Sequence, residues 1–213
     1  VMISHKNVLW TIESLFGQMI PATKFPRIVS YLPMAHIAAR AGDHYQAIYR
    51  IGQIFPVPVL EDMKEALPTI KPSVFLAVPR VWEKFKAGLE AKIEENPKKD
   101  LIAKAIQNGL EKVDYEQNGE SVPFMVGLKD KIFAKLVFSK FKEGLGIVDT
   151  EYFVTAAAPM NKDVHRWFHA IGIDVTEIYG MTEDTGPATI GVPGNAVESF
   201  EKRLKVDSIK VPS

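Results

Sequence analysis

The feature that most constrains the fold is the segment at residues 73–78, where Val, Phe, Leu and Ala side chains follow one another without polar alternation. A strand of this kind is buried on both faces, as the strands of a parallel sheet are. The residues after it form an amphipathic helix pattern with one apolar stripe, made of Val81, Phe85, Leu89 and Ile93. This pair of segments predicts an α/β fold with helices flanking a mostly parallel sheet.

The same alternation recurs along most of the chain. Strands are expected at residues 27–34, 53–59, 73–78, 152–156 and 173–179, and helices at residues 8–20, 36–50 and 60–67 and after Asn161. Residues 96–144 carry little strand signal and are predicted to form a helical insertion on the sheet. We expect one domain over residues 1–190 and an irregular tail at residues 191–213.

The composition removes several classes of protein. Basic and acidic side chains balance at 26 each, so the surplus of positive charge needed for a general grip on nucleic acid is missing. The absence of cysteine excludes thiol nucleophiles, disulfide scaffolds and Cys-type zinc sites. No transmembrane run or signal peptide pattern is present in the 213 residues, and we expect a cytoplasmic protein.

Chemistry is expected beyond the carboxyl ends of the strands, where ligands bind in sheets of this kind. The clearest candidate is the segment Tyr179, Gly180, Met181, Thr182 and Glu183. Tyr179 offers a face for a nucleobase, Thr182 a hydroxyl for a phosphate oxygen, and Glu183 a carboxylate for a hard cation such as Mg²⁺. Gly180 permits a sharp turn with close backbone approach. The alternative is a plain turn into a helix, because Thr and Glu also suit a first helical turn.

Three other strand ends carry weaker candidates. The small residues Ala157, Ala158 and Pro159 would let a flat ring lie against the backbone, or would simply allow a helix to pack closely. His36 could orient a carboxylate or phosphate oxygen, although an isolated histidine is more often structural. Arg80, at a helix start, could contact an anion or brace its loop.

Two further patterns are interpreted as structural. His165 and His169 have the spacing of metal ligands, but no Glu stands between them in a metal-binding motif and no third ligand is near in sequence. The apolar stripe over residues 128–141 is predicted to pack against the core, with peripheral contact to a membrane left open as the alternative.

The motifs together resemble one family. VMISHKN, SYLPMAH, FLAVPRVWEK, LVFSKFKEGLG, TAAAPM and EIYGMTEDTGPATI occur in the order and spacing of the adenylate-forming acyl-CoA synthetases. They are most similar to the long-chain fatty acid type and its bubblegum-like branch, over nearly all of residues 1–190. The resemblance implies the large N-terminal domain of such a ligase, which uses ATP, Mg²⁺ and coenzyme A to convert a long-chain fatty acid to its thioester.

The resemblance also implies roles for individual residues. Thr182 would contact phosphate, Glu183 would bind Mg²⁺, and His36 would lie near the fatty acid carboxylate and the α-phosphate. The nucleotide-binding residues would be Ala157, Ala158, Pro159, Tyr179, Gly180 and Met181, with Tyr179 stacked on adenine.

The sequence departs from the family pattern in several places. The phosphate loop, the ribose-binding aspartate, the hinge and the C-terminal domain with its catalytic lysine have no counterpart here, and Ala156 replaces a common glycine. We therefore expect the central part of the N-terminal domain, separate from the remainder of the enzyme and inactive in adenylation by itself. Two alternatives stay open, a non-catalytic binding or interaction module and adenylation of an aryl or other carboxylic acid.

Overall fold

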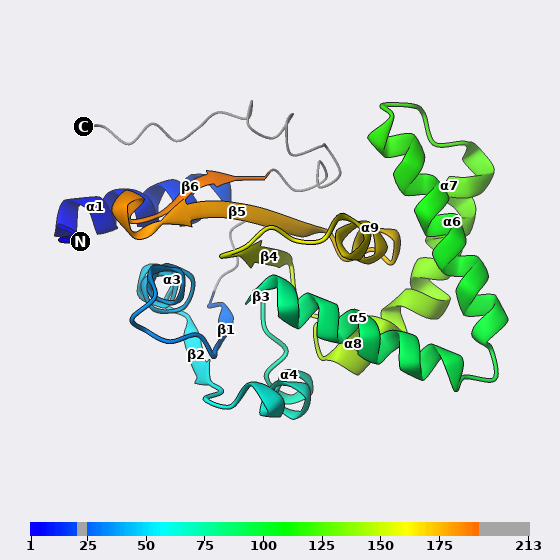
Figure 1. The fold of residues 1–213 in the computed structure, drawn as a ribbon, viewed down its shortest axis with the longest axis horizontal. Coiled ribbons are helices and arrows are strands. Elements are labelled where there is room, and N and C mark those ends of the chain that lie inside the picture. Colours follow the sequence, from blue (N-terminus) through cyan, green and yellow to red (C-terminus); the bar gives the residue numbers. More distant parts are fainter. Residues whose placement is uncertain (21–24, 192–213) are drawn as a thin grey trace.

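The computed structural model of the protein describes residues 1–20 and 25–191. Its centre is a six-stranded sheet in the order β2-β1-β3-β4-β5-β6 (Figure 1). Strands β1 to β5 are parallel, and β6 runs antiparallel to β5. The strands are β1 (Arg27–Ser30), β2 (Gln53–Pro56), β3 (Val74–Ala77), β4 (Tyr152–Ala156), β5 (Val175–Met181) and β6 (Gly186–Ile190).

Helices occupy the connections between the strands. The α-helices are α1 (His5–Ile12), α2 (Ile37–Ala39), α3 (Gln46–Arg50), α4 (Met63–Ile70), α5 (Pro79–Glu94), α6 (Lys99–Gln117), α7 (Phe124–Phe133), α8 (Ser139–Leu145) and α9 (Lys162–Ala170). Among the described residues, the π-helical segments are η1 (Glu13–Met19), η2 (Arg40–Tyr45) and η4 (Ala134–Phe138). The 3₁₀ turns are η3 (Leu60–Asp62) and η5 (Thr182–Asp184). The expected α/β class is confirmed.

Both faces of the central strands are buried, as the continuous apolar run predicts. In β3, Phe75 packs with α5 and α9 on one face, while Val74 and Leu76 pack with α1 and η1 on the other. Trp82 of α5 is fully buried and makes an edge contact with Phe75 at 5.5 Å between ring centroids. Since side chains alternate between the faces of a strand, an uninterrupted apolar run requires cover on both sides.

The β5–β6 edge differs from the sequence prediction. We expected a strand at residues 173–179 followed by a turn, but β5 extends to Met181 and the chain then returns as β6, which was not predicted. The reversal uses η5 and Thr185, whose φ of 63° lies in the left-handed region. Gly180 lies inside a strand rather than at a turn. Glycine is required there because any Cβ would overlap the backbone of Gly186 on β6.

The helical insertion consists of α6, α7, η4 and α8. Its helices α6 and α7 stand beyond α9, and α8 lies beside α5 (Figure 1). Gly109 of α6 lies so close to α9 that an added Cβ would overlap the carbonyl oxygen of Ala170. Among the described residues, no helix combines the length and apolar character needed to cross a membrane. The predicted tail at residues 191–213 lies, beyond Gly191, outside the described residues.

Candidate functional site

The candidate site lies at the carboxyl ends of the strands. One hollow there has a volume of about 530 Å³, within the range of small-ligand pockets. The residues that line it come from the β4 exit, from β5 and from β6 and its end: Ala157, Ala158, Pro159, Glu177, Ile178, Tyr179, Gly180, Thr189, Ile190 and Gly191. The structure thus brings together five of the residues expected to bind nucleotide, from two segments that lie about twenty positions apart in the sequence.

One wall of this hollow is backbone and small side chains. Ala157 follows β4 directly and has a φ of 76°, a conformation that costs a non-glycine residue about 1–2 kcal/mol. The left-handed turn lies one residue after Ala156, the position where the sequence departs from the family glycine. Ala158 is exposed and carries only a methyl group, so a planar ligand can lie against this wall.

Another wall is the bulged edge of β5. The side chain of Tyr179 is 57% exposed, which leaves its ring free to stack on a planar group. The β5–β6 register shifts between Tyr179 and Gly180. Glu177, which sequence reasoning missed, also lines this hollow, and its Oε1 accepts a hydrogen bond of 3.2 Å from the backbone N–H of Met160.

The remaining residues of the β5 motif lie outside this hollow. Met181 is 40% exposed at the end of β5, and Thr182 and Glu183 are exposed on η5. Within the described residues, no group of three or more His, Asp or Glu side chains could by itself hold a metal ion. An isolated carboxylate does suit Mg²⁺, which takes most of its other ligands from water and substrate phosphates.

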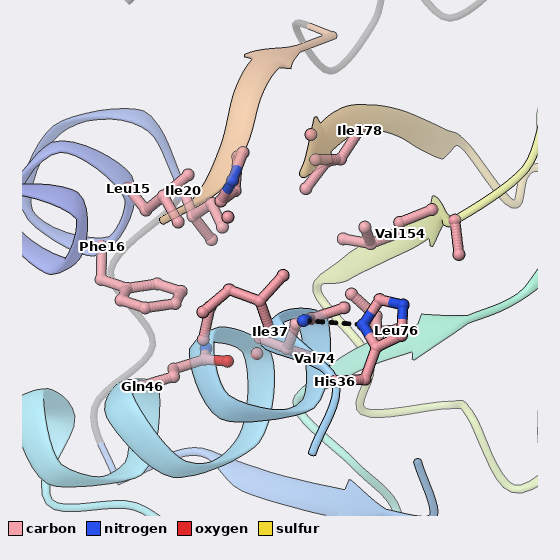
Figure 2. Close-up of a pocket in the computed structure, with 18 residues that line it drawn as sticks. Leu15, Phe16, Ile20, His36, Ile37, Gln46, Val74, Leu76, Val154 and Ile178 are labelled. Atoms are coloured by element: carbon pink, nitrogen blue, oxygen red, sulfur yellow. Dashed lines mark hydrogen bonds between the residues drawn. The ribbon is translucent and has the colours of Figure 1, made fainter. Parts of the chain in front are cut away.

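His36 caps the N-terminus of α2. Its Nδ1 accepts a hydrogen bond of 3.1 Å from the backbone N–H of Ala38, shown dashed in Figure 2. In the neutral ring the proton therefore resides on Nε2, which can donate to a ligand oxygen. Two smaller hollows are lined by both His36 and Ala157, and Ala157 also lines the large one. Ala157 thus connects the large hollow to the two smaller ones, which His36 also lines.

One of these neighbours is an apolar pocket of about 80 Å³ (Figure 2). It lies between η1, the helices α2 and η2, and the sheet, with Gln46 at its edge. Figure 2 shows apolar side chains that converge on it from these elements: Leu15, Phe16, Ile20, Ile37, Leu76, Val154 and Ile178. This pocket is suited to a hydrocarbon group.

Two buried polar side chains stand on the helix beside the apolar pocket. Asp43 is 2% exposed, and burial raises the pKa of its carboxyl to about 6, partly opposed by a hydrogen bond from Ser30. Gln46 is 1% exposed, lines the pocket, and has an amide Nε2 without a hydrogen-bond partner. Neither was singled out from the sequence, where a lone Asp or Gln on a helix gives no signal of burial.

The other sequence candidates lie apart from these hollows. Arg80 is exposed at the start of α5. His165 Nε2 lies 2.6 Å from the carbonyl oxygen of Val175. His169 lies between Glu116 and Asp174, at 3.0 Å and 3.4 Å. These contacts give both histidines partners within the fold, as expected if they have a structural role.

The fold and the hollows together define an α/β ligand-binding domain in which a ring-sized pocket adjoins an apolar one at the strand ends. The family model described as "AMP-binding enzyme" matches residues 1–211, and the chain belongs to that family.

Curated relatives carry fatty-acid ligase names. The chain is 33% identical over 204 residues to the long-chain-fatty-acid–CoA ligase ACSBG2 of Rattus norvegicus, a match that covers 89% of this chain and 29% of the relative. It is also 33% identical over 200 residues to the putative fatty-acid–CoA ligase fadD11 of Mycobacterium tuberculosis, covering 91% and 34%. The chain therefore spans about a third of the length of these relatives.

Solved structures show the same fold at lower identity. The N-terminal domain of FACL13 from Mycobacterium tuberculosis matches with a TM-score of 0.57 and 20% identity, over 92% of this chain and 37% of that one. The A domain of carboxylic acid reductase from Segniliparus rugosus, in complex with AMP and a carboxylic acid, matches with a TM-score of 0.55 and 16% identity, over 89% and 26%. The expected N-terminal-domain fold of adenylate-forming enzymes is confirmed.

Proposed function

We propose that the protein to which this chain belongs is an AMP-forming long-chain fatty acid–CoA ligase, and that this chain carries its adenine and acyl sites. One observation carries the proposal. The ring-sized hollow contains five residues expected to bind nucleotide, and it shares Ala157 with the apolar pocket. An acyl adenylate needs this arrangement, since its adenine and its hydrocarbon chain extend from one phosphate–carboxyl centre.

The reaction has two steps. A carboxylate oxygen of the fatty acid attacks the α-phosphorus of ATP, which forms acyl-AMP and releases pyrophosphate. The sulfur of coenzyme A, after loss of its thiol proton, then attacks the acyl carbon and AMP leaves. The mixed anhydride supplies the leaving group that a carboxylate lacks, and fixed donors stabilise the charge that builds up at phosphorus.

The nucleotide half of the site uses the two walls of the large hollow. Adenine lies between the small residues Ala157, Ala158 and Pro159 and the ring of Tyr179, while the Gly180 backbone allows close approach. Met181 and Thr182 continue the segment toward the phosphates, where the Thr182 hydroxyl donates to an oxygen. Glu183 would hold Mg²⁺, which when bound would supply positive charge to neutralise the phosphates.

The acyl half uses His36 and the apolar pocket. The Nε2–H of His36 is available to orient the carboxylate at the junction of the hollows, because Nδ1 is occupied by Ala38. The first part of the hydrocarbon chain enters between Leu76, Val154 and Ile178. Burial of each methylene contributes about 0.8 kcal/mol, which favours long-chain over short-chain acids.

Binding of a fluorescent AMP analogue to the 213-residue chain tests the nucleotide site without requiring turnover. Loss of a base–aromatic stack costs about 1–3 kcal/mol, so Tyr179→Ala should weaken binding about tenfold or more. Tyr115→Ala on α6 is the matched control and should bind as the unaltered chain does. No binding by the unaltered chain, or equal loss in both variants, would refute the adenine assignment.

Non-hydrolysable acyl-AMP analogues test the acyl class. A palmitoyl analogue should displace the fluorescent nucleotide at a concentration at least tenfold lower than a benzoyl analogue. Equal displacement would favour an aryl or general acid instead. Substitution of Leu76 by Glu, which places a charge in the apolar pocket at a residue that does not line the nucleotide hollow, should remove the advantage of the palmitoyl group and leave AMP binding in place.

A further inference from the structure

An exposed apolar face runs along the helical insertion. On α7 and η4, the large apolar side chains at positions 124, 125, 128, 132 and 136 point away from the core. Four of these positions recur at intervals of four residues, the spacing that places side chains on one side of a helix. Their exposed fractions are large: Phe124 79%, Met125 56%, Leu128 41%, Ile132 47% and Leu136 63%.

The opposite side of the same helix is firmly attached to the protein. Val126 is buried, and its carbonyl oxygen accepts a hydrogen bond from the amide of Asn108 on α6. Asp130 forms an ion pair of 3.0 Å with Lys112 of α6. The exposed face therefore belongs to a docked helix and does not reflect a helix that lacks a packing partner.

The apolar residues at positions 128–141 lie on two sides of the helix. Leu128, Ile132 and Leu136 are exposed, whereas Val137 and Phe138 are buried in the core. Val137 follows Leu128 by nine residues, which at 3.6 residues per turn places it on the opposite side of the helix axis. The prediction that the whole stripe packs against the core is thus wrong for Leu128, Ile132 and Leu136.

Positive charge surrounds the exposed face. Residues 124–142 contain lysines at positions 129, 131, 135, 140 and 142 and one carboxylate, Asp130, while the whole chain has no net charge. Lys129, Lys131 and Lys135 are exposed. Across residues 1–20 and 25–191, no carboxylate forms an ion pair with these three lysines.

The position of α7 leaves the face accessible within the described structure. Figure 1 shows α7 at one end of the molecule, with α1 and β6 at the other. An apolar helix face bordered by lysines is the pattern of a helix that lies in a membrane interface, where apolar side chains enter the lipid and lysines reach the headgroups. The charge selects an anionic surface among the possible apolar partners.

We propose that the face formed by Phe124, Met125, Leu128, Ile132 and Leu136, with Lys129, Lys131 and Lys135 around it, binds the surface of an anionic lipid bilayer. The helix lies in the plane of the interface and does not cross the bilayer. The proposal rests on the insertion alone and stands independently of the proposed ligase function.

Sedimentation of the chain with lipid vesicles tests the proposal. The chain should bind phosphatidylserine-containing vesicles more tightly than pure phosphatidylcholine vesicles, and less tightly as salt rises. Leu128→Ser with Ile132→Ser and Leu136→Ser should weaken binding on the order of a hundredfold. The matched control changes Leu9, Ile48 and Ile51 to Ser, three apolar residues that are at least as exposed elsewhere, and should leave binding unchanged.

A charge variant tests the lysines separately. Lys129→Gln with Lys131→Gln and Lys135→Gln should lower the affinity for anionic vesicles about a hundredfold and remove most of the salt dependence. The same change at Lys64, Lys84 and Lys92, on α4 and α5, is the control. Circular dichroism should show that all variants fold, because every altered side chain is exposed.

A probe on the helix provides a second measurement. Tryptophan in place of Phe124 should shift its emission to shorter wavelength with anionic vesicles and be quenched by brominated lipid, whereas Leu9→Trp should not respond. The proposal fails if the unaltered chain does not sediment with anionic vesicles or if the serine variant binds as well as its control. It also fails if the serine variant instead abolishes self-association seen by light scattering, which would make the face a contact between copies.

Discussion

The strand-end site and the helical insertion both depend on one glycine at a close backbone contact, yet they use it differently. Gly180 brings β5 against β6 at the edge of the nucleotide hollow, and Gly109 brings α6 against the end of α9. The first contact shapes a cavity wall, whereas the second fixes the insertion to the sheet domain. Backbone proximity thus positions a ligand site in one region and a surface for a partner in the other.

The two regions also differ in the partners of their polar side chains. The helix beside the apolar pocket buries Asp43 and Gln46 with unpartnered atoms. The insertion is linked to α9 by Arg166 with Asp114 and by His169 with Glu116. The interface is not fully paired, since the buried Nε of Arg166 also lacks a hydrogen-bond partner. The regions therefore differ in their ion pairs, which hold α6 against α9 at the insertion and are replaced by neutral and single charged groups beside the pocket.

Replacement of each glycine by alanine should give the largest difference in nucleotide binding between the two regions. Either Cβ would overlap backbone, so Gly180→Ala and Gly109→Ala should each lower the free energy of unfolding by about 3 kcal/mol. Only Gly180→Ala should also weaken binding of the fluorescent AMP analogue. Urea unfolding and fluorescence titration provide the two measurements, and equal loss of nucleotide affinity in both variants would contradict the division.

Asp43→Asn tests the buried carboxyl beside the acyl pocket. The pKa of Asp43 is about 6 when folded, above its ordinary 3.8, so the folded state binds more protons and its stability falls as pH rises between about 4 and 6. The variant should therefore be more stable than the unaltered chain by about 2 kcal/mol at pH 7.5 and nearly equal at pH 4. Thermal unfolding across pH measures this, and a variant less stable at pH 7.5 would show that the Ser30 bond outweighs burial.

His169→Gln tests the link to the insertion in a higher pH range. Burial alone would lower the pKa of His169, but hydrogen bonds and charge from Asp174 and Glu116 outweigh it and raise the pKa. Its contribution is therefore complete below about pH 6.5 and is lost as pH rises through the raised value.

The variant should lose about 1 kcal/mol at pH 6 and less at pH 9. Hydrogen exchange should show the change in α6 and α9, with the strands at the nucleotide hollow unaffected. Loss of equal size at both pH values would assign His169 a packing role.

The location of the site could be predicted because parallel strands end at the same edge of a sheet. Ala157, Ala158, Pro159, Tyr179 and Gly180 were expected there from sequence, and they line one hollow. Met181, Thr182 and Glu183 follow in the same motif but lie outside it. A short motif therefore identified the region, while the curvature of β5 and η5 decided which members face the hollow.

The site residues that the sequence did not predict were missed for one physical reason, which is that their place at the site depends on the packing of distant segments. Thr189 belongs to β6, a short strand that begins with Gly and Pro and lacks clear alternation, although the turn residues before it indicate a hairpin. Glu177 is on a predicted strand but gives no sign of facing a cavity. Asp43 of η2 and Gln46 of α3 become buried only when these helices pack beside the sheet.

The sequence by itself determined the alternation of strands and helices, the two-sided burial of β3, and the edge of the sheet at which a ligand would bind. These properties follow from local side-chain patterns and from the direction of parallel strands. Only the tertiary structure decided that Gly180 meets β6, that Ala157 is shared among three hollows, and that the insertion exposes part of its apolar stripe. Each of these depends on contacts between distant segments, which no local pattern encodes.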